Sequence, residues 1–275
     1  MSKTIAYLGP PGTFTEEAAN QYDPTATRHP MPSISAIAAS VIANTVDEGV
    51  VPIENSREGS VNDTLDLLIH GSGLAINNEL VLPVVHSLVA KPGTDLNKVE
   101  LIYSHPNALG QCREFIEQEL TQAKTTPSLS TVAAVEDMLA SDKVAVAIAR
   151  QRTADLYNVE VLVNDILSDQ INATRFVVLG KNDHLPTGND KTSICLAFSG
   201  DKPGLLHTVL GEFAKHKINL TKVESRPSKE SLGRYIFLID LEGHRDVEPI
   251  EAVLQEVASH ASIFKIFGSY PRFPL

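Results

Sequence analysis

The sequence has few of the features that mark secreted or membrane-bound proteins. Only two cysteines occur among the 275 residues, Cys112 in a helical pattern and Cys195 in a strand pattern, and both positions favour a buried small side chain over a disulfide. No apolar run approaches the roughly 18 residues of a membrane-spanning helix, and the first apolar stretch breaks at Gly9-Pro10-Pro11-Gly12. We therefore predict a globular protein of the cytoplasm that has no membrane partner.

Positive charge is scarce, and lysines and arginines form no cluster along the chain. The formal net charge is -11 at pH 7. Nucleic-acid binding needs a basic surface, so this charge argues against a nucleic-acid partner. An anionic small ligand would have to be held locally, by helix N-termini and one or two arginines, because salt screens more distant charges over about 8 Å.

Motifs for metals and nucleotides are also missing. The nine histidines include no His-x-x-x-His pair with a neighbouring Glu, and the chain has no Cys-x-x-Cys and no Gly-x-Gly-x-x-Gly after a strand. The glycine-bearing segment that ends at Thr13 lacks the Lys-Ser/Thr end of a phosphate loop. We expect a reaction without metal or cofactor.

Residues 1 to about 180 alternate between strand-like and helix-like segments, which predicts an α/β region with ligands at the carboxyl ends of strands. Thr13 and Glu16 form a capping-box pattern before a helix at 14–21. A single helix is expected to carry the apolar series Leu109, Cys112, Phe115, Ile116 and Leu120. The expected strands include Ile5–Leu8, Val99–Tyr103, 144–148 and Phe176–Leu179.

After a polar linker at 181–190, the remaining residues predict a second, compact unit. Strand and helix patterns follow one another in the order βαββαβ, which is the ferredoxin-like arrangement. The expected elements are strands at 192–198, 218–224, 235–241 and 263–267 and helices at 204–215 and 249–259. The chain therefore predicts two domains.

Three adjacent residues, Thr174-Arg175-Phe176, place a hydroxyl, a cation and an aromatic ring at the start of a buried strand. A strand holds side chains rigidly, and this set suits a small substrate with a carboxylate. Taken alone, Thr and Arg at such a position are more often surface residues or members of a structural salt bridge.

Other polar residues at strand ends have structural alternatives as well. The segment from Pro52 to Ser60 could form a turn with a helix N-cap made by Ser60 or Asn62. His86 could be a hydrogen-bonded structural residue. His105, just before Pro106, could face an anion or water.

Several motifs, taken in order, resemble the prephenate dehydratases that carry a regulatory ACT domain, and the resemblance covers nearly the full chain. The motifs in the first region are Gly9-Pro10-Pro11-Gly12-Thr13-Phe14, Pro52-Ile53-Glu54-Asn55-Ser56, Gly59-Ser60-Val61, His86-Ser87-Leu88, Ser104-His105-Pro106, Gln111-Cys112, and Asn172 with Thr174-Arg175-Phe176. The motifs in the second region are Glu224-Ser225-Arg226-Pro227 and Gly268-Ser269-Tyr270-Pro271. Any one of these motifs could occur by chance, but their joint order is specific.

The resemblance implies a catalytic domain at 1–181 with two α/β lobes similar to type 2 periplasmic binding proteins, and an ACT domain at 191–275. The lobes would span about 1–78 plus 170–180, and 79–169. The implied reaction converts prephenate to phenylpyruvate. Thr174 would assist the departing hydroxyl, Arg175 would hold a carboxylate and Phe176 would exclude water. Further substrate-binding residues would be Asn55, Ser56, Ser60, His86, Ser87, Ser104, His105, Gln111 and Thr131.

The ACT domain implies regulation by L-phenylalanine and pairing into a homodimer or homotetramer. Leu205 replaces a small residue of the family pattern, which leaves the effector open. The effector-binding residues would be Gly204, Leu205, Leu206, Asn219, Leu220, Glu224, Ser225, Arg226 and Pro227. Two alternatives remain at this point, an arogenate dehydratase and an amino-acid sensor without catalytic activity.

Overall fold

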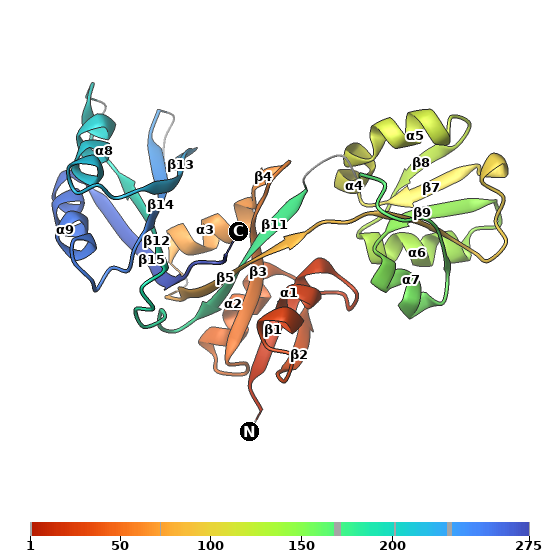
Figure 1. Cartoon of the computed structure of the whole chain (residues 1–275), viewed down its shortest axis with the longest axis horizontal. Coiled ribbons are helices and arrows are strands. Elements are labelled where there is room, and N and C mark those ends of the chain that lie inside the picture. The colour runs from red at the N-terminus through yellow and green to blue at the C-terminus, as the bar shows by residue number, and fades with distance from the viewer. Residues whose placement is uncertain (1, 72, 168–171, 201, 230–232, 275) are drawn as a thin grey trace.

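The computed structural model describes residues 2–71, 73–167, 172–200, 202–229 and 233–274. Its strands form three separate sheets, each covered by helices, and the sheet that contains the N-terminal strand lies between the other two (Figure 1). The mixed α/β fold that the sequence predicts is confirmed.

The central sheet is built from the first third of the chain and one late strand. In spatial order it contains β2 (Thr27–Met31), β1 (Thr4–Leu8), β3 (Glu48–Asn55), β11 (Ala173–Gly180) and β5 (Ala75–Pro83), with the short β4 (Gly59–Ser60) paired to β3. Strand β11 runs antiparallel to both of its neighbours. Because β5 extends to Pro83, residues 79–83 belong to this sheet, whereas the sequence had placed them in the second lobe.

Helices α1 (Phe14–Tyr22), α2 (Ile34–Ile42) and α3 (Asn62–His70) pack on the central sheet. Thr13 caps α1 as expected, since its side chain accepts a hydrogen bond from the Glu16 N–H. The Glu16 carboxylate instead accepts from the Gly12 N–H. The N-cap of α3 is Val61, without a side-chain hydrogen bond, so the cap considered for Ser60 or Asn62 is not formed.

The second sheet contains β10 (Glu160–Val163), β6 (Ser87–Ala90), β9 (Ala145–Ala149), β7 (Leu101–Ser104) and β8 (Lys124–Pro127). Its helical segments are the 3₁₀ turn Leu96–Lys98, α4 (Pro106–Gln111), α5 (Arg113–Glu119), α6 (Thr131–Ala140) and α7 (Gln151–Tyr157). The expected single helix over the series from Leu109 to Leu120 was wrong. Cys112 leaves the helical conformation at φ -91° and ψ 11°, and this separates α4 from α5.

The C-terminal sheet has the order β13 (Leu220–Pro227), β14 (Tyr235–Glu242), β12 (Asp190–Ala197) and β15 (Ile263–Pro271), with helices α8 (Leu205–Lys215) and α9 (Ile250–His260). The order along the chain is βαββαβ, so the ferredoxin-like prediction is confirmed. Strand β15 also packs against β5 of the central sheet, which joins the C-terminal domain to the rest of the molecule.

A glycine permits this close approach. Gly268 in β15 has a φ of +152°, and a Cβ atom at this position would lie 2.1 Å from the Ile76 carbonyl oxygen of β5. A side chain would therefore force the two strands apart. The need for glycine here comes from contact between domains.

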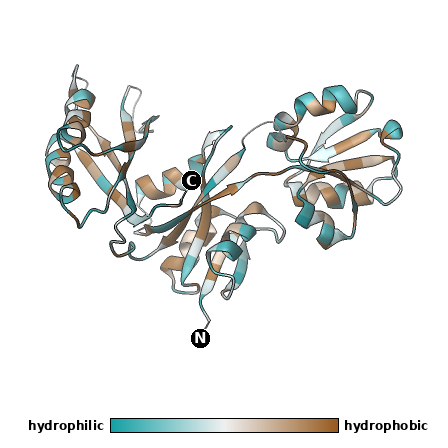
Figure 2. Cartoon of the chain, in the orientation of Figure 1, coloured by the Kyte–Doolittle hydropathy of each residue, from teal (hydrophilic) through white to brown (hydrophobic). Residues whose placement is uncertain are grey.

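Hydrophobic residues are concentrated in the strands and on the inward faces of the helices, while the outer surfaces are more hydrophilic (Figure 2). One core cluster joins the central sheet to the C-terminal domain through residues such as Val177, Ile236 and Tyr270. Cys112 and Cys195 are both free and buried, as expected. Within the described residues, no helix has the length and apolar character needed to cross a membrane.

Candidate active site and its contacts with the C-terminal domain

Strand β11 places Thr174 beside the end of β3, where residue 174 pairs with Asn55. The Thr174 hydroxyl oxygen accepts a hydrogen bond of 3.0 Å from the Asn55 side-chain nitrogen. With its lone pair engaged in this way, the hydroxyl can direct its own proton toward a bound ligand. This arrangement gives a hydrogen-bond donor at the position where the sequence predicts one.

The orientation of the Asn55 amide is fixed by the turn that follows β3. Its oxygen accepts from the backbone N–H groups of Arg57 and Glu58 at 2.9 and 3.1 Å. The nitrogen must then face the opposite way, toward Thr174 and toward the side-chain oxygen of Asn172, 3.0 Å away. The turn thereby sets which end of the amide meets the Thr174 hydroxyl.

The hydrogen bonds continue from Asn172 to the second lobe. The Asn172 nitrogen donates to the Gln111 oxygen at 2.8 Å, and His86 Nε2 lies 2.9 Å from the same oxygen. The Gln111 nitrogen donates to Glu58 at 2.5 Å, which fixes the orientation of this amide too. A chain of side chains therefore links the lobes in the order Thr174, Asn55, Asn172, Gln111 and His86.

His86 is held neutral in this chain. It is 3% exposed, and its burial lowers the pKa of the imidazole below the usual 6.5 although the hydrogen bond to Gln111 acts in the opposite direction. Because the Gln111 oxygen can only accept, the hydrogen of His86 sits on Nε2. Among the described residues, the buried Nδ1 atom finds no hydrogen-bond partner.

Several other predicted substrate ligands have structural partners. Ser56 is tied to the start of β11, because its hydroxyl accepts from the Ala173 N–H at 3.0 Å. Ser87 and Ser104 are fully buried and donate to the Asn164 side chain and the Ile148 carbonyl, respectively. His105 is the N-cap of α4, and Thr131 is half-buried in the first turn of α6.

Arg175 faces the C-terminal domain. Its Nε atom donates to Glu79 of β5 at 2.7 Å, while Nη1 donates to Asp240 at 2.6 Å and Nη2 to the Tyr270 hydroxyl at 2.7 Å. Burial opposes the charge, but the acidic neighbours, Asp240 first, raise the pKa of the guanidinium. The predicted contact between Arg175 and a substrate carboxylate stays a prediction, and in this structure every guanidinium nitrogen already has a partner.

Phe176 lies on the same side of β11 as Thr174, in keeping with the alternation of side chains along a strand. Its ring is 1% exposed and packs in a cluster that includes Tyr7, Val50 and Leu82. This hydrophobic cluster packs against the side of β11 that carries Phe176.

The buried charges around Arg175 are balanced. Glu79 also accepts two bonds of 2.8 Å from Lys191, so two buried cations, Arg175 and Lys191, lie against the two buried carboxylates of Glu79 and Asp240. Burial raises the pKa of the Asp240 carboxyl, yet the charge of Arg175 outweighs this and leaves the pKa below its usual value. A balanced cluster of this kind is tolerated in a protein interior, whereas a lone charge is not.

Ser60 and Glu224, predicted for the substrate and effector sites respectively, lie in contact. The Ser60 hydroxyl donates to the Glu224 carboxylate at 2.5 Å and accepts from Lys222 at 2.9 Å. Arg226 binds Asp66 of α3 at 2.9 Å. The inner face of β13 therefore rests on the catalytic region.

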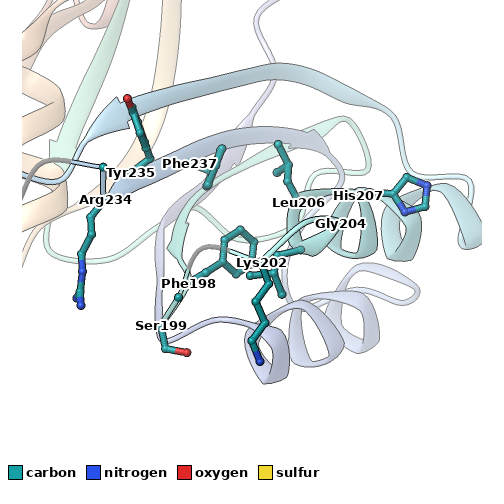
Figure 3. A pocket seen from close by; sticks show the side chains of 12 residues that line it. Phe198, Ser199, Lys202, Gly204, Leu206, His207, Arg234, Tyr235 and Phe237 are labelled. Atoms are coloured by element: carbon teal, nitrogen blue, oxygen red, sulfur yellow. The ribbon is translucent and has the colours of Figure 1, made fainter.

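The first predicted effector motif borders a pocket of about 470 Å³ at the start of α8 (Figure 3). Gly204, Leu205 and Leu206 line it together with two phenylalanines, Phe198 and Phe237. The second motif is not part of this lining. Glu224, Ser225, Arg226, Pro227 and Leu220 lie on β13, and Asn219 lines a different pocket.

The residues that the sequence did not identify belong to the contact between domains. Asp240, Tyr270, Lys191 and Glu79 come from four strands, and Asp240 and Tyr270 are 65 and 95 positions from Arg175. In the sequence, Tyr270 stands out only as part of the closing motif Gly268-Ser269-Tyr270-Pro271. Side chains alternate between the two faces of a strand, so Arg175 must point away from the face that carries Thr174. This alternation is the sequence signal that indicates a partner for Arg175 on the other face of β11.

Comparisons with known proteins agree with these observations. The sequence profile of the family described as prephenate dehydratase matches residues 5–184, and that of the ACT domain matches residues 193–259. A prephenate dehydratase of Methanocaldococcus jannaschii is 38% identical over 280 residues, which covers 99% of this chain and 100% of the relative.

Two solved structures share the whole arrangement. The prephenate dehydratase of Arthrobacter aurescens in complex with L-Phe has a TM-score of 0.89 at 36% identity and covers 98% of this chain and 90% of its own. GqqA, described as a novel type of quorum quenching acylase, has a TM-score of 0.85 at 28% identity, with 99% and 98% covered.

Proposed function

Because this chain belongs to the prephenate dehydratase family, we propose that it converts prephenate to phenylpyruvate and that L-phenylalanine regulates this reaction through the C-terminal domain. The observation that carries the proposal is the Thr174 hydroxyl, which is oriented by Asn55 and lies at the end of a hydrogen-bond chain between two lobes. We place the protein in the cytoplasm and propose that it is a homodimer or homotetramer.

The reaction breaks two bonds and makes the ring aromatic. The bond from the ring to its carboxylate breaks and releases carbon dioxide, and its electron pair enters the ring. The ring hydroxyl leaves from the opposite carbon and takes up one proton to become water. The enzyme's main task is to help this hydroxyl depart, because aromatisation favours the rest.

Thr174 is the group that would hydrogen-bond the departing oxygen. A positioned donor of this kind commonly contributes about 10²- to 10⁴-fold to the rate. The bond from Asn55 withdraws electron density from the Thr174 oxygen and so strengthens its O–H as a donor. The proton that the hydroxyl gives up is replaced from water.

The remaining groups of the hydrogen-bond chain are neutral, which suits this substrate. One carboxylate must lose its charge as carbon dioxide leaves, so a cation placed on it would stabilise the starting state more than the transition state. The amides of Asn55, Asn172 and Gln111 and the neutral imidazole of His86 avoid this cost. They also join the two lobes around the substrate.

For regulation, we propose that the phenylalanine side chain packs against the adjoining rings of Phe198 and Phe237 in the pocket beside Gly204 and Leu206. Aromatic rings favour such contacts by about 0.5–1.5 kcal/mol beyond area burial. Within one chain, Glu224 and Arg226 of the second motif bind Ser60 and Asp66 instead of lining this pocket, so we propose that a second copy of the chain supplies these two side chains to it.

The decisive experiment incubates the purified protein with prephenate and measures phenylpyruvate, with and without phenylalanine. Thr174→Ala should lower kcat by about 10²-fold or more with little change in KM, while Thr174→Ser should retain most activity. Turnover of Thr174→Ala at the parent rate would refute the acid role. Arogenate, tested in parallel, measures the preference between the two substrates.

Two further outcomes separate the alternatives. If the protein binds phenylalanine but turns over neither prephenate nor arogenate, it acts as an amino-acid sensor. Acylase activity in the same preparation, without prephenate turnover, would align it with GqqA instead.

A further inference from the structure

Arg175 joins the strand of the candidate acid to the C-terminal domain. Thr174 and Arg175 are successive residues of β11, and their Cα atoms are about 3.8 Å apart in any trans peptide. The Thr174 side chain reaches Asn55, whereas the Arg175 side chain reaches Asp240 and Tyr270. A displacement of the Arg175 backbone would therefore shift the Thr174 hydroxyl relative to a bound ligand.

Four side chains at this contact form a closed ring of hydrogen bonds with determined directions. Arg175 donates through Nη1 to Asp240 and through Nη2 to the Tyr270 oxygen. Ser193 donates to the other Asp240 oxygen at 2.5 Å and lies 2.5 Å from the Tyr270 hydroxyl. Because the Ser193 proton is used on Asp240, the Tyr270 hydroxyl must donate to Ser193.

The ring is buried and rigid. Asp240 is 7% exposed, and Tyr270 and Ser193 are 0% and 2% exposed. Every hydrogen-bonding group in it has a partner, and a fully satisfied buried network holds its members in one arrangement. The guanidinium is consequently positioned by the C-terminal domain as much as by its own strand.

Strand β14 connects this ring to the pocket at the start of α8. Tyr235 and Phe237 line that pocket, and Asp240 follows on the same strand. A ligand that moves β14 would thus also move the acceptor of Arg175. No other element is required between the pocket and the ring.

We propose that Asp240 and Tyr270 are positioning residues for the reaction at Thr174, acting through Arg175, so that the C-terminal domain supports catalysis in addition to carrying an effector site. This inference rests on the proposed function. It predicts that small changes at Asp240, Tyr270 or Ser193 affect turnover more than substrate binding, because these residues act on the Thr174 hydroxyl only through Arg175.

The test uses Tyr270→Phe, which removes one hydroxyl and keeps the buried ring. We expect kcat with prephenate to fall about 10-fold while KM changes less than about 2-fold. Phenylalanine should still bind, as measured by calorimetry, but should change turnover less than in the parent. Ser193→Ala breaks the ring at a smaller side chain and should give the same fall in kcat, with little change in KM and a weaker response to phenylalanine. It replaces Tyr270→Phe in the test if that variant does not fold.

Lys229→Gln is the matched control. Lys229 also crosses between the domains, where it binds Asp66 at 2.6 Å, but it does not contact the ring or β11. This variant should keep the parental kcat and response. Parental kcat and response in folded Tyr270→Phe and Ser193→Ala would overturn the proposal, as would an equal loss in Lys229→Gln.

Amide hydrogen exchange gives a readout that does not depend on turnover. Phenylalanine should change the exchange of the β11 amides in the parent, and this change should be reduced in Tyr270→Phe. If the parent fails to turn over prephenate, the proposed function fails, while the exchange result still decides whether the ring couples the domains. Unchanged β11 exchange on phenylalanine binding would refute the coupling.

Discussion

The Ser60 hydroxyl donates a hydrogen bond of 2.5 Å to the carboxylate of Glu224, across the boundary between the catalytic region and the C-terminal domain. Lys222 binds both groups, at 2.9 Å from the Ser60 oxygen and 3.1 Å from the carboxylate. Burial raises the pKa of Glu224, but the bonds from Ser60 and Lys222 outweigh it and lower the pKa overall. The two residues form one polar contact that links the domains.

Changing Glu224 should therefore affect regulation and the domain contact together. We expect Glu224→Ala to weaken the response to phenylalanine by about 5-fold or more, because it removes both an effector-motif carboxylate and the acceptor of Ser60. Inhibition curves with phenylalanine measure this. Ser60→Ala removes the same hydrogen bond from the other side, and a similar loss in it would assign the effect to the contact. A fully sensitive Glu224→Ala protein would exclude Glu224 from regulation.

Activity should depend on the side-chain nitrogen of Asn55, which the substitution Asn55→Asp replaces with an oxygen. In Asn55→Asp the carboxylate cannot donate to the Thr174 hydroxyl, and its charge would repel a dianionic substrate. We expect kcat to fall by about 10²-fold and KM to rise. Steady-state kinetics with prephenate distinguish the two effects. Asn97→Asp, the same change at an exposed position, is the control and should behave like the parent.

His86 should make the protein less stable in mild acid. Burial lowers the pKa of the His86 imidazole in the folded protein below 6.5. Above pH 6.5 the imidazole is therefore neutral in both the folded and the unfolded protein. As the pH falls below this value the unfolded chain takes up a proton first, and stability is lost toward the folded pKa. Thermal unfolding between pH 7.5 and 5 should show a steeper decrease in Tm for the parent than for His86→Gln. Equal slopes would contradict the assignment.

Gly268 should tolerate no side chain. In Gly268→Ala the new Cβ would lie 2.1 Å from the Ile76 carbonyl oxygen, and the φ of +152° disfavours any L side chain. We expect a loss of about 2 kcal/mol or more in stability and easier proteolysis between the domains. Gly211→Ala, within α8 and with open space around it, is the control and should be neutral or stabilising.

The sequence predicted the fold well because the pattern of each element is local. The apolar runs of β1, β9 and β11 and the N-cap at Thr13 act within a few residues. Equally local patterns give the βαββαβ order of the C-terminal unit. The helix break at Cys112 escaped prediction, since the apolar series continues through it with helical spacing.

The sequence predicted the site residues that meet because two neighbouring strands pair in a fixed register, and it missed those that meet through contact between domains. Thr174 and Asn55 meet because they pair across β11 and β3, and both came from motifs. The direction of the Arg175 side chain depends on which face of β11 the C-terminal domain covers, and β14 and β15 form that surface only after the whole chain has folded. No local pattern around Asp240 or Tyr270 reports this contact.

The closed ring around Arg175 also limits how such a protein can be rebuilt by exchanging domains. A regulatory domain grafted from an unrelated sensor would leave the Arg175 guanidinium without its acceptors and the Glu79 carboxylate without the Lys191 donor. A functional chimera would have to carry Lys191, Ser193, Asp240, Gly268 and Tyr270 with it. Exchange of whole domains at the linker is therefore expected to succeed only with donor domains that bring these five residues.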